Sequence, residues 1–373
     1  MTPLRVLLAS PGLGRQARGA EIFSADCCAA LRDDLRLDLV LARGGGERRE
    51  GELRIPNVPR DSSWGIRLGT RLGGDGYTGE VWSFALGLLP HLVRLRPRVV
   101  YVTELLLARV LRRWRTATRS RFRLLLWNGA PYRPPFPDAD FVQQLTPERV
   151  ELALAAGERP ERQAFVPPGF FLAGRRVPLD AESKRALRRR LGLPEEKPVV
   201  LSVGVLDPVH KGQDRLIRAC AQCKRANFLL LLGGRADTTA SLEELARAVL
   251  GPRVAVRSTE PSNVADYYAA ADVFALASLR EGFGLVFVEA AAHGLPCIVD
   301  GGSGAREVLG EWGTYVDTLD HAAFTKALDA ALASSPAPDA AARHDAMVAR
   351  YDWANLRESY VAMLRAAAAV SIR

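Results

Sequence analysis

Short apolar runs and stretches of helical periodicity alternate along the whole chain. The runs are nearly continuous, which is typical of strands that are covered on both faces of a parallel sheet. In the first half the pattern predicts strands at 4–9, 35–42, 98–102, 123–127 and 164–166, and helices at 20–31, 80–95 and 104–115. Residues 43–79 are rich in Gly and Arg without clear periodicity, so they are predicted to form a long loop.

The second half of the chain repeats this scheme. Predicted strands lie at 199–203, 228–232, 254–256, 273–276 and 297–299, and predicted helices at 180–191, 213–224, 241–250, 262–270 and 285–293. Strands that alternate with helices in this way indicate βαβ units. We therefore expect an α/β fold of two Rossmann-like, doubly wound domains that face each other across a cleft.

The boundary between the two domains is expected at Pro167-Pro168-Gly169, which combines a rigid step with a permissive one. The first domain then covers 1–168 and the second 169–351. From residue 320 onwards the pattern is helical and rich in Ala. We expect its last helix, at about 352–373, to cross back onto the first domain.

The segment richest in candidate chemistry follows the predicted strand at 273–276. In parallel sheets of this kind, ligands bind just beyond the carboxyl ends of the strands. Here the loop Arg-Glu-Gly-Phe-Gly leads into a helix, and the backbone N–H groups of Phe283, Gly284 and Leu285 lie at its N-terminus, an arrangement suited to a diphosphate. Glu281 lies in the loop and could accept hydrogen bonds from sugar hydroxyls.

Glu289 lies one turn into the same helix, among apolar residues. A carboxylate in such a place needs hydrogen-bond donors, and a ribose diol supplies two. Each glutamate also has a purely structural interpretation, in which Glu281 caps the helix and Glu289 pairs with an arginine.

This segment closely resembles glycosyltransferase family 4, a retaining family with the GT-B fold that has two glutamates eight positions apart in an EGFG-type motif. The resemblance is strong over 199–309, weak over 1–170 and uninformative over 43–79. It implies a nucleoside diphosphate sugar as donor, with Glu281 on its sugar hydroxyls and Glu289 on its ribose. It also implies that Phe283, Gly284 and Leu285 contact the sugar and the phosphates through their backbones.

A second match to the family is the loop after the predicted strand at 199–203. Here Gly204 ends the strand, and Lys211 stands just before the next helix. The resemblance implies that Lys211 binds the donor diphosphate, whereas by itself it could be a solvated loop lysine. The family usually has an arginine after Gly204, where this chain has Val205. Three residues are candidates for the second positive charge: His210, Arg15 and Arg18.

Two matches in the first domain are weaker. The turn after the first strand contains Gly14, Arg18 and Gly19, and family members often have paired glycines at the last two positions. It lacks the Gly-x-Gly-x-x-Gly spacing, but it is expected to face the diphosphate. The family commonly places a histidine near the reacting carbon, and this chain has Asn128 there. Asn128 can donate and accept hydrogen bonds but cannot titrate, and it could simply be a turn residue before Gly129.

Charge is unevenly distributed along the chain. Residues 1–170 have 26 Lys and Arg against 18 Asp and Glu, a net charge of +8, whereas 171–373 have a net charge of +1. The run from Arg109 to Arg123 contains seven arginines, one Trp and no acid. An anionic membrane or acceptor is one interpretation of this excess, and a solvated helix end is the other. Nucleic acid is not expected, because no recognised module is present.

The remaining composition excludes several classes of protein. Five cysteines imply no disulfide framework, and Cys220 and Cys223 are expected to be buried small residues rather than zinc ligands. No run of 18 uncharged apolar residues predicts a spanning helix, and the N-terminal apolar run is too short for a signal peptide. A cytoplasmic location, with contact to the inner membrane face as an option, is therefore expected. No metal cofactor is expected, because helix N-termini together with Lys211 can supply the positive charge that a diphosphate needs.

The function predicted from these features is retaining transfer of a hexosyl unit from a nucleoside diphosphate sugar to an acceptor hydroxyl, in polysaccharide, glycolipid or glycoconjugate biosynthesis. The residues expected to act in catalysis are Glu281, Lys211 and Asn128. Two alternatives remain open. One is another enzyme of the same fold, such as a sugar phosphorylase or a nucleotide-sugar epimerase. The other is a catalytically silent subunit that binds a sugar nucleotide.

Overall fold

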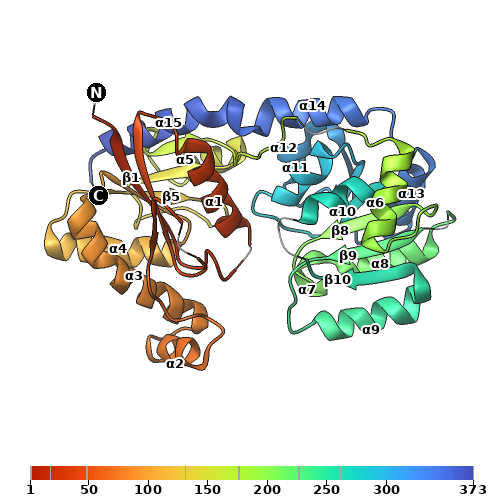
Figure 1. The fold of residues 1–373 in the computed structure, drawn as a ribbon, viewed down its shortest axis with the longest axis horizontal. Helices are drawn as coiled ribbons and strands as arrows, with labels where there is room; N and C mark the ends of the chain where they lie inside the picture. The colour runs from red at the N-terminus through yellow and green to blue at the C-terminus, as the bar shows by residue number, and fades with distance from the viewer. Residues whose placement is uncertain are drawn as a thin grey trace. The chain divides into compact units, whose positions relative to one another are not determined.

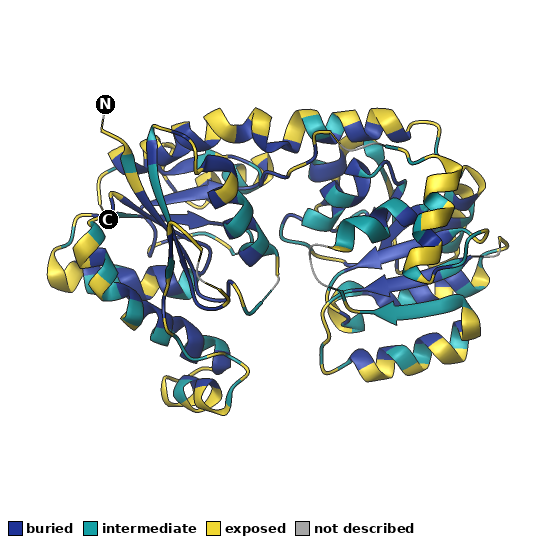
Figure 2. Ribbon diagram, in the orientation of Figure 1, coloured by how far each residue is buried: buried dark blue, intermediate teal, exposed yellow. Residues whose placement is uncertain are grey.

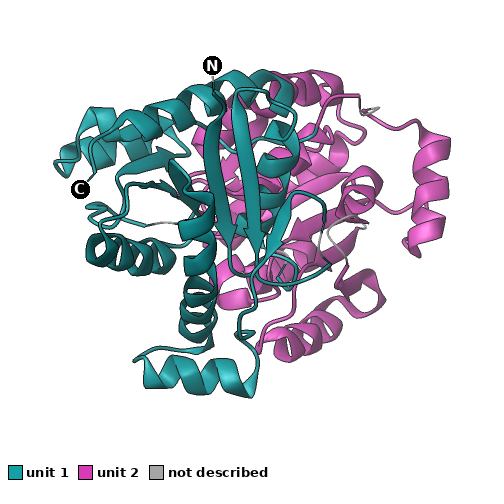
Figure 3. Cartoon of the chain, turned by 60° about the vertical axis from the view of Figure 1, so that its left-hand side comes forward, with its two compact units in different colours: residues 1–171, 353–373 teal, residues 172–352 magenta. Residues whose placement is uncertain are grey.

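A computed structural model of the chain describes residues 2–16, 18–47, 49–130, 132–174, 177–225, 227–259 and 263–372. It divides into two compact units (Figure 3). Unit 1 consists of Met1–Phe171 together with Trp353–Arg373, and unit 2 consists of Leu172–Asp352. Each unit is built on one parallel β-sheet with helices against it (Figure 1).

The sheet of unit 1 has seven strands in the order β3-β2-β1-β4-β5-β6-β7. They are β1 (Leu4–Ser10), β2 (Leu37–Arg43), β3 (Glu52–Arg54), β4 (Val99–Val102), β5 (Arg123–Trp127), β6 (Phe141–Gln144) and β7 (Gln163–Phe165). The helices are α1 (Gly19–Leu31), α2 (Ser63–Arg71), α3 (Gly76–Leu95), α4 (Leu105–Thr118), α5 (Pro147–Ala155), η1 (Pro160–Arg162) and α15 (Trp353–Ala369).

Strand β1 lies between β2 and β4, and every strand pair in the sheet is parallel. Strands β1, β2 and β3 follow one another towards one edge of the sheet, after which the chain returns to place β4 on the other side of β1. The carboxyl ends of β1 and β4 therefore form the topological switch point of unit 1, where ligands of such sheets bind. The central strands β4, β5 and β6 are almost wholly buried, as expected for a sheet with helices on both faces (Figure 2).

Helix α15 completes unit 1, which confirms the expected return of the last helix to the first domain. The N–H of Trp353 donates to the carbonyl of Phe170 at 2.9 Å, and the hydroxyl of Tyr360 donates to that of Pro167 at 2.9 Å. Gly169 is needed beside this helix, because a Cβ there would lie 2.4 Å from the Trp353 ring.

The sheet of unit 2 has six strands in the order β10-β9-β8-β11-β12-β13. They are β8 (Val199–Val203), β9 (Phe228–Leu232), β10 (Val254–Arg257), β11 (Val273–Leu276), β12 (Cys297–Asp300) and β13 (Gly313–Val316). The α-helices of unit 2 are α6 (Ala181–Leu191), α7 (Pro208–Lys211), α8 (Gln213–Gln222), α9 (Thr239–Leu250), α10 (Val264–Ala270), α11 (Leu285–Ala292), α12 (Ala305–Leu309), α13 (His321–Ala333) and α14 (Ala340–Tyr351). Its switch point lies between β8 and β11.

The prediction of a long loop at 43–79 is wrong in part, because this stretch contains β3, α2 and the beginning of α3. Strands β6 and β13 were also not predicted. The predicted helix at 262–270 begins outside the described residues and is observed from Val264. Cys223 follows the end of α8 and is only partly buried, whereas Cys220 is fully buried. Among the residues described, no helix combines the length and apolarity needed to cross a membrane.

Candidate functional site

The loops that follow β8, β11 and β12 meet at the carboxyl edge of the sheet in unit 2. The side chain of Lys211, at the end of α7, reaches the loop after β11, where its Nζ donates to Oε1 of Glu281 at 2.7 Å. The backbone N–H of Glu281 in turn donates to the carbonyl of Ser303 in the loop after β12, at 3.2 Å. Two residues predicted from separate motifs are thus brought into direct contact at the switch point.

Glycines shape this edge of unit 2. A Cβ at Gly204 would lie 3.4 Å from the Lys211 side chain, so the lysine packs over the bare backbone at the end of β8. Gly212 has a φ of +63° and joins α7 to α8, and a Cβ there would lie 2.5 Å from the carbonyl oxygen of Ala277. These contacts explain why the loop that carries Lys211 contains glycine where it crosses the strand ends.

The N-terminus of α11 supplies backbone donors at the same edge. Gly284 is its N-cap with a φ of +80°, and a Cβ there would lie 2.3 Å from the Phe287 ring. Within the described parts of the chain, no backbone hydrogen bond occupies the N–H groups of Phe283, Gly284 or Leu285. The side chain of Phe283 is buried against Tyr351, which leaves its backbone as the polar part of the residue. This arrangement suits an anion.

Glu289 lies one turn into α11 and is half-buried. Its Oε2 accepts a hydrogen bond of 2.8 Å from the hydroxyl of Tyr268, a fully buried residue of α10. Burial and the charge of Glu289 hold the pKa of Tyr268 well above its usual value, so the tyrosine stays a donor. The alternative in which Glu289 also pairs with an arginine stays a prediction. Tyr268, which donates to Glu289, is a residue that sequence reasoning missed.

The family usually has a diphosphate-binding arginine where this chain has Val205, and the neighbouring elements α7 and α8 supply basic side chains. His210 is largely exposed, and its Nδ1 lies 2.5 Å from Oδ2 of Asp207 on its own turn. Arg215, in the first turn of α8, was not considered from the sequence. Its Nη2 donates to the carbonyl of Ala277 at 2.5 Å, which places a guanidinium at the carboxyl end of β11. Arg215 is therefore a second cation at this edge, besides Lys211.

In unit 1, the turn after β1 packs against the loop after β2. A Cβ at Gly14, whose φ is +88°, would lie 2.2 Å from the carbonyl oxygen of Gly45. Arg15 is directed to Asn57, with its Nη1 donating to Oδ1 at 2.5 Å. Arg18 is the exposed N-cap residue of α1, and Gly19 is the first residue of that helix. Their predicted contacts with a donor stay predictions.

Asn128 lies at the end of β5 and is 1% exposed. Its Nδ2 donates to Oε1 of Gln144 at 2.8 Å, and Nε2 of Gln144 donates to Oε1 of Gln163 at 2.8 Å. This row of buried amides ties β5, β6 and β7 together. The contacts give Asn128 a structural role, and its predicted role in catalysis stays a prediction.

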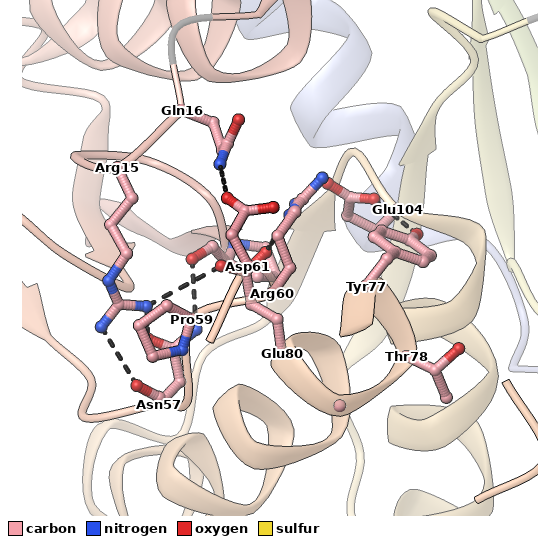
Figure 4. Close-up of polar contacts among 12 residues, drawn as sticks. Arg15, Gln16, Asn57, Pro59, Arg60, Asp61, Tyr77, Thr78, Glu80 and Glu104 are labelled. Carbon is pink, nitrogen blue, oxygen red and sulfur yellow. Dashed lines mark hydrogen bonds and ion pairs between the residues drawn. The ribbon is translucent and has the colours of Figure 1, made fainter. Parts of the chain in front are cut away.

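A buried polar cluster occupies the switch point of unit 1, and sequence reasoning did not identify it. We name it the switch-point cluster and define it by its residues Ser10, Glu21, Arg60, Tyr77, Glu80, Thr103 and Glu104. Nε of Arg60 donates to Oε2 of Glu80 at 2.6 Å, and the hydroxyl of Tyr77 donates to Oε2 of Glu104 at 2.6 Å. Figure 4 shows these two contacts beside the one between Arg15 and Asn57.

The arginine run 109–123 is partly internal to unit 1. Arg109 and Arg112 both pair with Asp138, at 3.1 and 2.9 Å, and Arg115 pairs with the fully buried Asp140. These three side chains satisfy carboxylates of their own unit, so the run is less available to a partner than its sequence indicates.

Residues 183–345, which lie in unit 2, match the family model described as Glycosyl transferases group 1. The chain is also similar to curated D-inositol 3-phosphate glycosyltransferases. That of Xylanimonas cellulosilytica is 36% identical over 197 residues, which are 50% of this chain and 46% of that protein. That of Geodermatophilus obscurus is 35% identical over 228 residues, which are 57% and 49%. The matched chain spans about half the length of these relatives.

Several solved structures are similar over nearly the whole chain. Anabaena HepE in complex with UDP and glucose has a TM-score of 0.74 and 19% identity, covering 97% of this chain and 99% of that one. Sucrose-phosphate synthase from Thermosynechococcus elongatus has a TM-score of 0.76 and 21% identity, covering 97% and 98%. WaaG, a glycosyltransferase involved in lipopolysaccharide biosynthesis, has a TM-score of 0.69 and 17% identity, covering 96% and 99%. These likenesses show the fold, and the expected GT-B class of two Rossmann-like domains is confirmed.

Proposed function

We propose that this protein is a retaining glycosyltransferase that moves a hexosyl unit from a nucleoside diphosphate sugar to an acceptor hydroxyl. The contact between Lys211 and Glu281 at the switch point of unit 2 is the observation that carries the proposal. It joins a cation suited to a diphosphate with a carboxylate suited to sugar hydroxyls. The family match over 183–345 and the UDP and glucose bound to Anabaena HepE support a donor of this class.

In the proposed reaction the bond between the anomeric carbon and the diphosphate oxygen breaks, and a bond from that carbon to the acceptor oxygen forms on the same face. The acceptor proton passes to the departing phosphate. Lys211, the N–H groups at the start of α11 and Arg215 would stabilise the charge that develops on the diphosphate, which is usually the largest catalytic contribution. Because these groups supply positive potential, the proposed reaction needs no metal cofactor.

Glu289, held by Tyr268, is proposed to bind the ribose of the donor, and this assignment gives the test. Loss of a hydrogen bond that involves a charged group costs about 1.5–3 kcal/mol, or roughly ten- to 150-fold in affinity. We expect E289A to weaken binding of both UDP-glucose and UDP by such a factor in calorimetric titrations. If the donor of this protein carries a base other than uracil, a thermal-shift panel of nucleoside diphosphate sugars identifies that donor first.

The matched control for this test is E244A, because Glu244 is exposed on α9 of the same unit. It should bind the nucleotide like the unaltered protein. Unchanged nucleotide affinity in folded E289A would contradict the assignment. The alternative of a silent binding subunit is favoured by Val205, which replaces the usual arginine. Tight donor binding without transfer to any acceptor, and without hydrolysis, would support that alternative.

A further inference from the structure

The switch-point cluster of unit 1 is a buried polar site that the proposed donor chemistry does not use. It draws on the end of β1, the first turn of α1, the loop before α2, helix α3 and the residues that follow β4. Ser10 and Thr103 are neighbours across the β1–β4 pair, because Ala9 is in register with Val102. The charges of Arg60 and Glu104 both act on Glu21, so the carboxylate of Glu21 lies beside them.

Five side chains of this cluster have a buried polar atom that lacks a hydrogen-bond partner within the described part of the chain. Ser10, Glu21 and Thr103 are 0%, 2% and 4% exposed. The unpartnered atoms are Oγ of Ser10, Oε2 of Glu21 and Oγ1 of Thr103. Among the described residues, Nη2 of Arg60 and Oε1 of Glu80 also lack a hydrogen-bond partner, although these two side chains form an ion pair. Buried polar atoms in native proteins nearly always have a partner. Unpartnered buried atoms on adjacent elements, at the switch point where ligands of such sheets bind, indicate a binding site.

The kinds of group present identify the chemistry of the ligand. Glu21 can only accept hydrogen bonds when it is ionised, whereas the hydroxyls of Ser10 and Thr103 can donate as well as accept. A phosphate offers mainly acceptors and would face the carboxylates of Glu21, Glu80 and Glu104. An ammonium group offers donors alone. Hydroxyl groups both donate and accept, so a polyol satisfies the whole set.

Arg60 and Arg15 are already engaged near the cluster, which strengthens the argument against a phosphate. Arg60 donates to Glu80 at 2.6 Å, and Arg15 donates to Asn57 through both of its terminal nitrogens, at 2.5 and 3.0 Å. Gly12 leaves room for the carboxylate of Glu21, because a Cβ at Gly12 would lie 2.3 Å from Oε1 of Glu21. Nη2 of Arg60 also lacks a hydrogen-bond partner in the part of the chain that is described, but the charge of Arg60 is paired with Glu80, so the carboxylates of Glu21 and Glu104 give the cluster an excess of negative charge.

We propose that the switch-point cluster binds an uncharged sugar or cyclitol through its hydroxyl groups, with Glu21 accepting from at least one of them. The inference rests on the proposed function in one respect, namely that the bound polyol is the acceptor. It extends that function by naming the acceptor class, and it sets this chain apart from a protein whose acceptor carries a phosphate at this position.

The test measures binding of neutral and charged probes by saturation-transfer NMR in the presence of saturating UDP. The neutral probes are myo-inositol and the methyl glycosides of glucose, mannose and N-acetylglucosamine. The charged probes are D-inositol 3-phosphate, the compound in the name of the curated relatives, and inorganic phosphate. We expect at least one neutral probe to bind, with no competition from inorganic phosphate. We also expect D-inositol 3-phosphate to bind no more tightly than myo-inositol.

Two variants place the binding on Glu21. E21Q keeps the shape of the side chain and should weaken the bound probe by at least tenfold, as expected for loss of a hydrogen bond to a charged group. G12A keeps the carboxylate but displaces it, so it should have the same effect. The control E148Q makes the same chemical change at an exposed position in α5 and should bind like the unaltered protein.

The outcomes separate this inference from the proposed function. Absence of binding by every neutral probe, tighter binding of D-inositol 3-phosphate than of myo-inositol, or unchanged binding in folded E21Q and G12A would each overturn the inference. Nucleotide binding at unit 2, measured on the same samples, reports on the proposed function independently. A polyol bound through Glu21 that never receives a sugar would keep the inference and overturn the proposed function.

Discussion

Glu21 shows how a single residue can serve a site at the expense of stability. Burial raises its pKa above the ordinary value of 4.5, the neighbouring charge of Glu104 raises it further, and Arg60 and Arg18 only partly oppose this. Because folding raises the pKa of this carboxyl group, the protonated group favours the folded state. This contribution to the free energy of unfolding is fully present below the unfolded pKa of about 4.5, and it is lost as the pH rises through the folded-state pKa. At neutral pH the ionised group therefore lowers the free energy of unfolding.

We predict that E21Q melts at a higher temperature than the unaltered protein at pH 7.5, with the difference vanishing towards pH 4.5. A gain of about 1 kcal/mol corresponds to about 2–4 °C for a unit of this size. Differential scanning calorimetry at several pH values measures the effect, and E148Q should follow the unaltered protein throughout. A lower melting temperature of E21Q at pH 7.5 would mean that the carboxylate is satisfied within the fold.

The residues that could be predicted from the sequence are those that lie within one motif. Glu281, Phe283, Gly284, Leu285 and Glu289 belong to a single strand–helix turn, so local spacing was enough to identify them as candidates. The members of the switch-point cluster lie on five separate segments and become neighbours only through the strand order β2-β1-β4. Strand order depends on which apolar faces pack together, and a single sequence does not state it.

At the scale of elements, α2 was missed for a physical reason. Its packing face consists of glycines rather than apolar side chains, because Gly65 and Gly69 lie against the beginning of α3. A Cβ at Gly69 would lie 1.6 Å from the carbonyl oxygen of Asp75, and one at Gly79 would lie 2.2 Å from that of Gly65. Helical periodicity is sought in apolar residues, so a helix that packs through its backbone escapes detection. The long periodic helices and the apolar strands were predicted well.

We predict that G69A destabilises unit 1, because the added methyl group would meet a backbone carbonyl that has no room to move. Overpacking of this kind costs typically 1–3 kcal/mol. Urea unfolding followed by circular dichroism should show the loss, with local opening of α2 and the beginning of α3 in hydrogen exchange. The control T70A changes the next residue, which is exposed, and should leave the midpoint nearly unchanged. A G69A protein as stable as T70A would show that the helices can separate without loss.

For the molecule as a whole, the net charge of +8 over residues 1–170 keeps a membrane-associated acceptor as a hypothesis, but the ion pairs of the arginine run 109–123 do not favour contact at that run. The arginines 109, 112 and 115 pair with Asp138 and Asp140, which lie more than twenty positions further along the chain. Replacing Arg115 would leave the buried Asp140 without this partner and damage the fold. The arginine run therefore makes a poor probe of membrane contact.

Helix α2 is the better candidate for a membrane contact, because its glycine face leaves its large side chains exposed (Figure 2). Trp64, Ile66 and Leu72 are 68%, 52% and 43% exposed, and Arg67 lies over the Trp64 ring at 5.8 Å. Residues 62–74 contain two arginines and no acid. Aromatic and aliphatic side chains beside arginines are the composition of a segment that lies in the interface of an anionic bilayer.

We predict that the protein floats with liposomes in proportion to their content of anionic lipid and dissociates as salt shortens the Debye length below about 10 Å. Each basic group near such a surface contributes about 1 kcal/mol, so R67S/R71S should weaken attachment by roughly thirtyfold and reduce its salt dependence. W64S/I66S should weaken it at all salt concentrations, because it removes buried apolar area instead of charge. The control L152S/L154S changes two exposed leucines of α5, beside Glu151 in the same unit, and should float like the unaltered protein. Equal flotation of all these proteins would place the contact elsewhere, and failure of the unaltered protein to float at low salt would make an acceptor free in solution the better hypothesis.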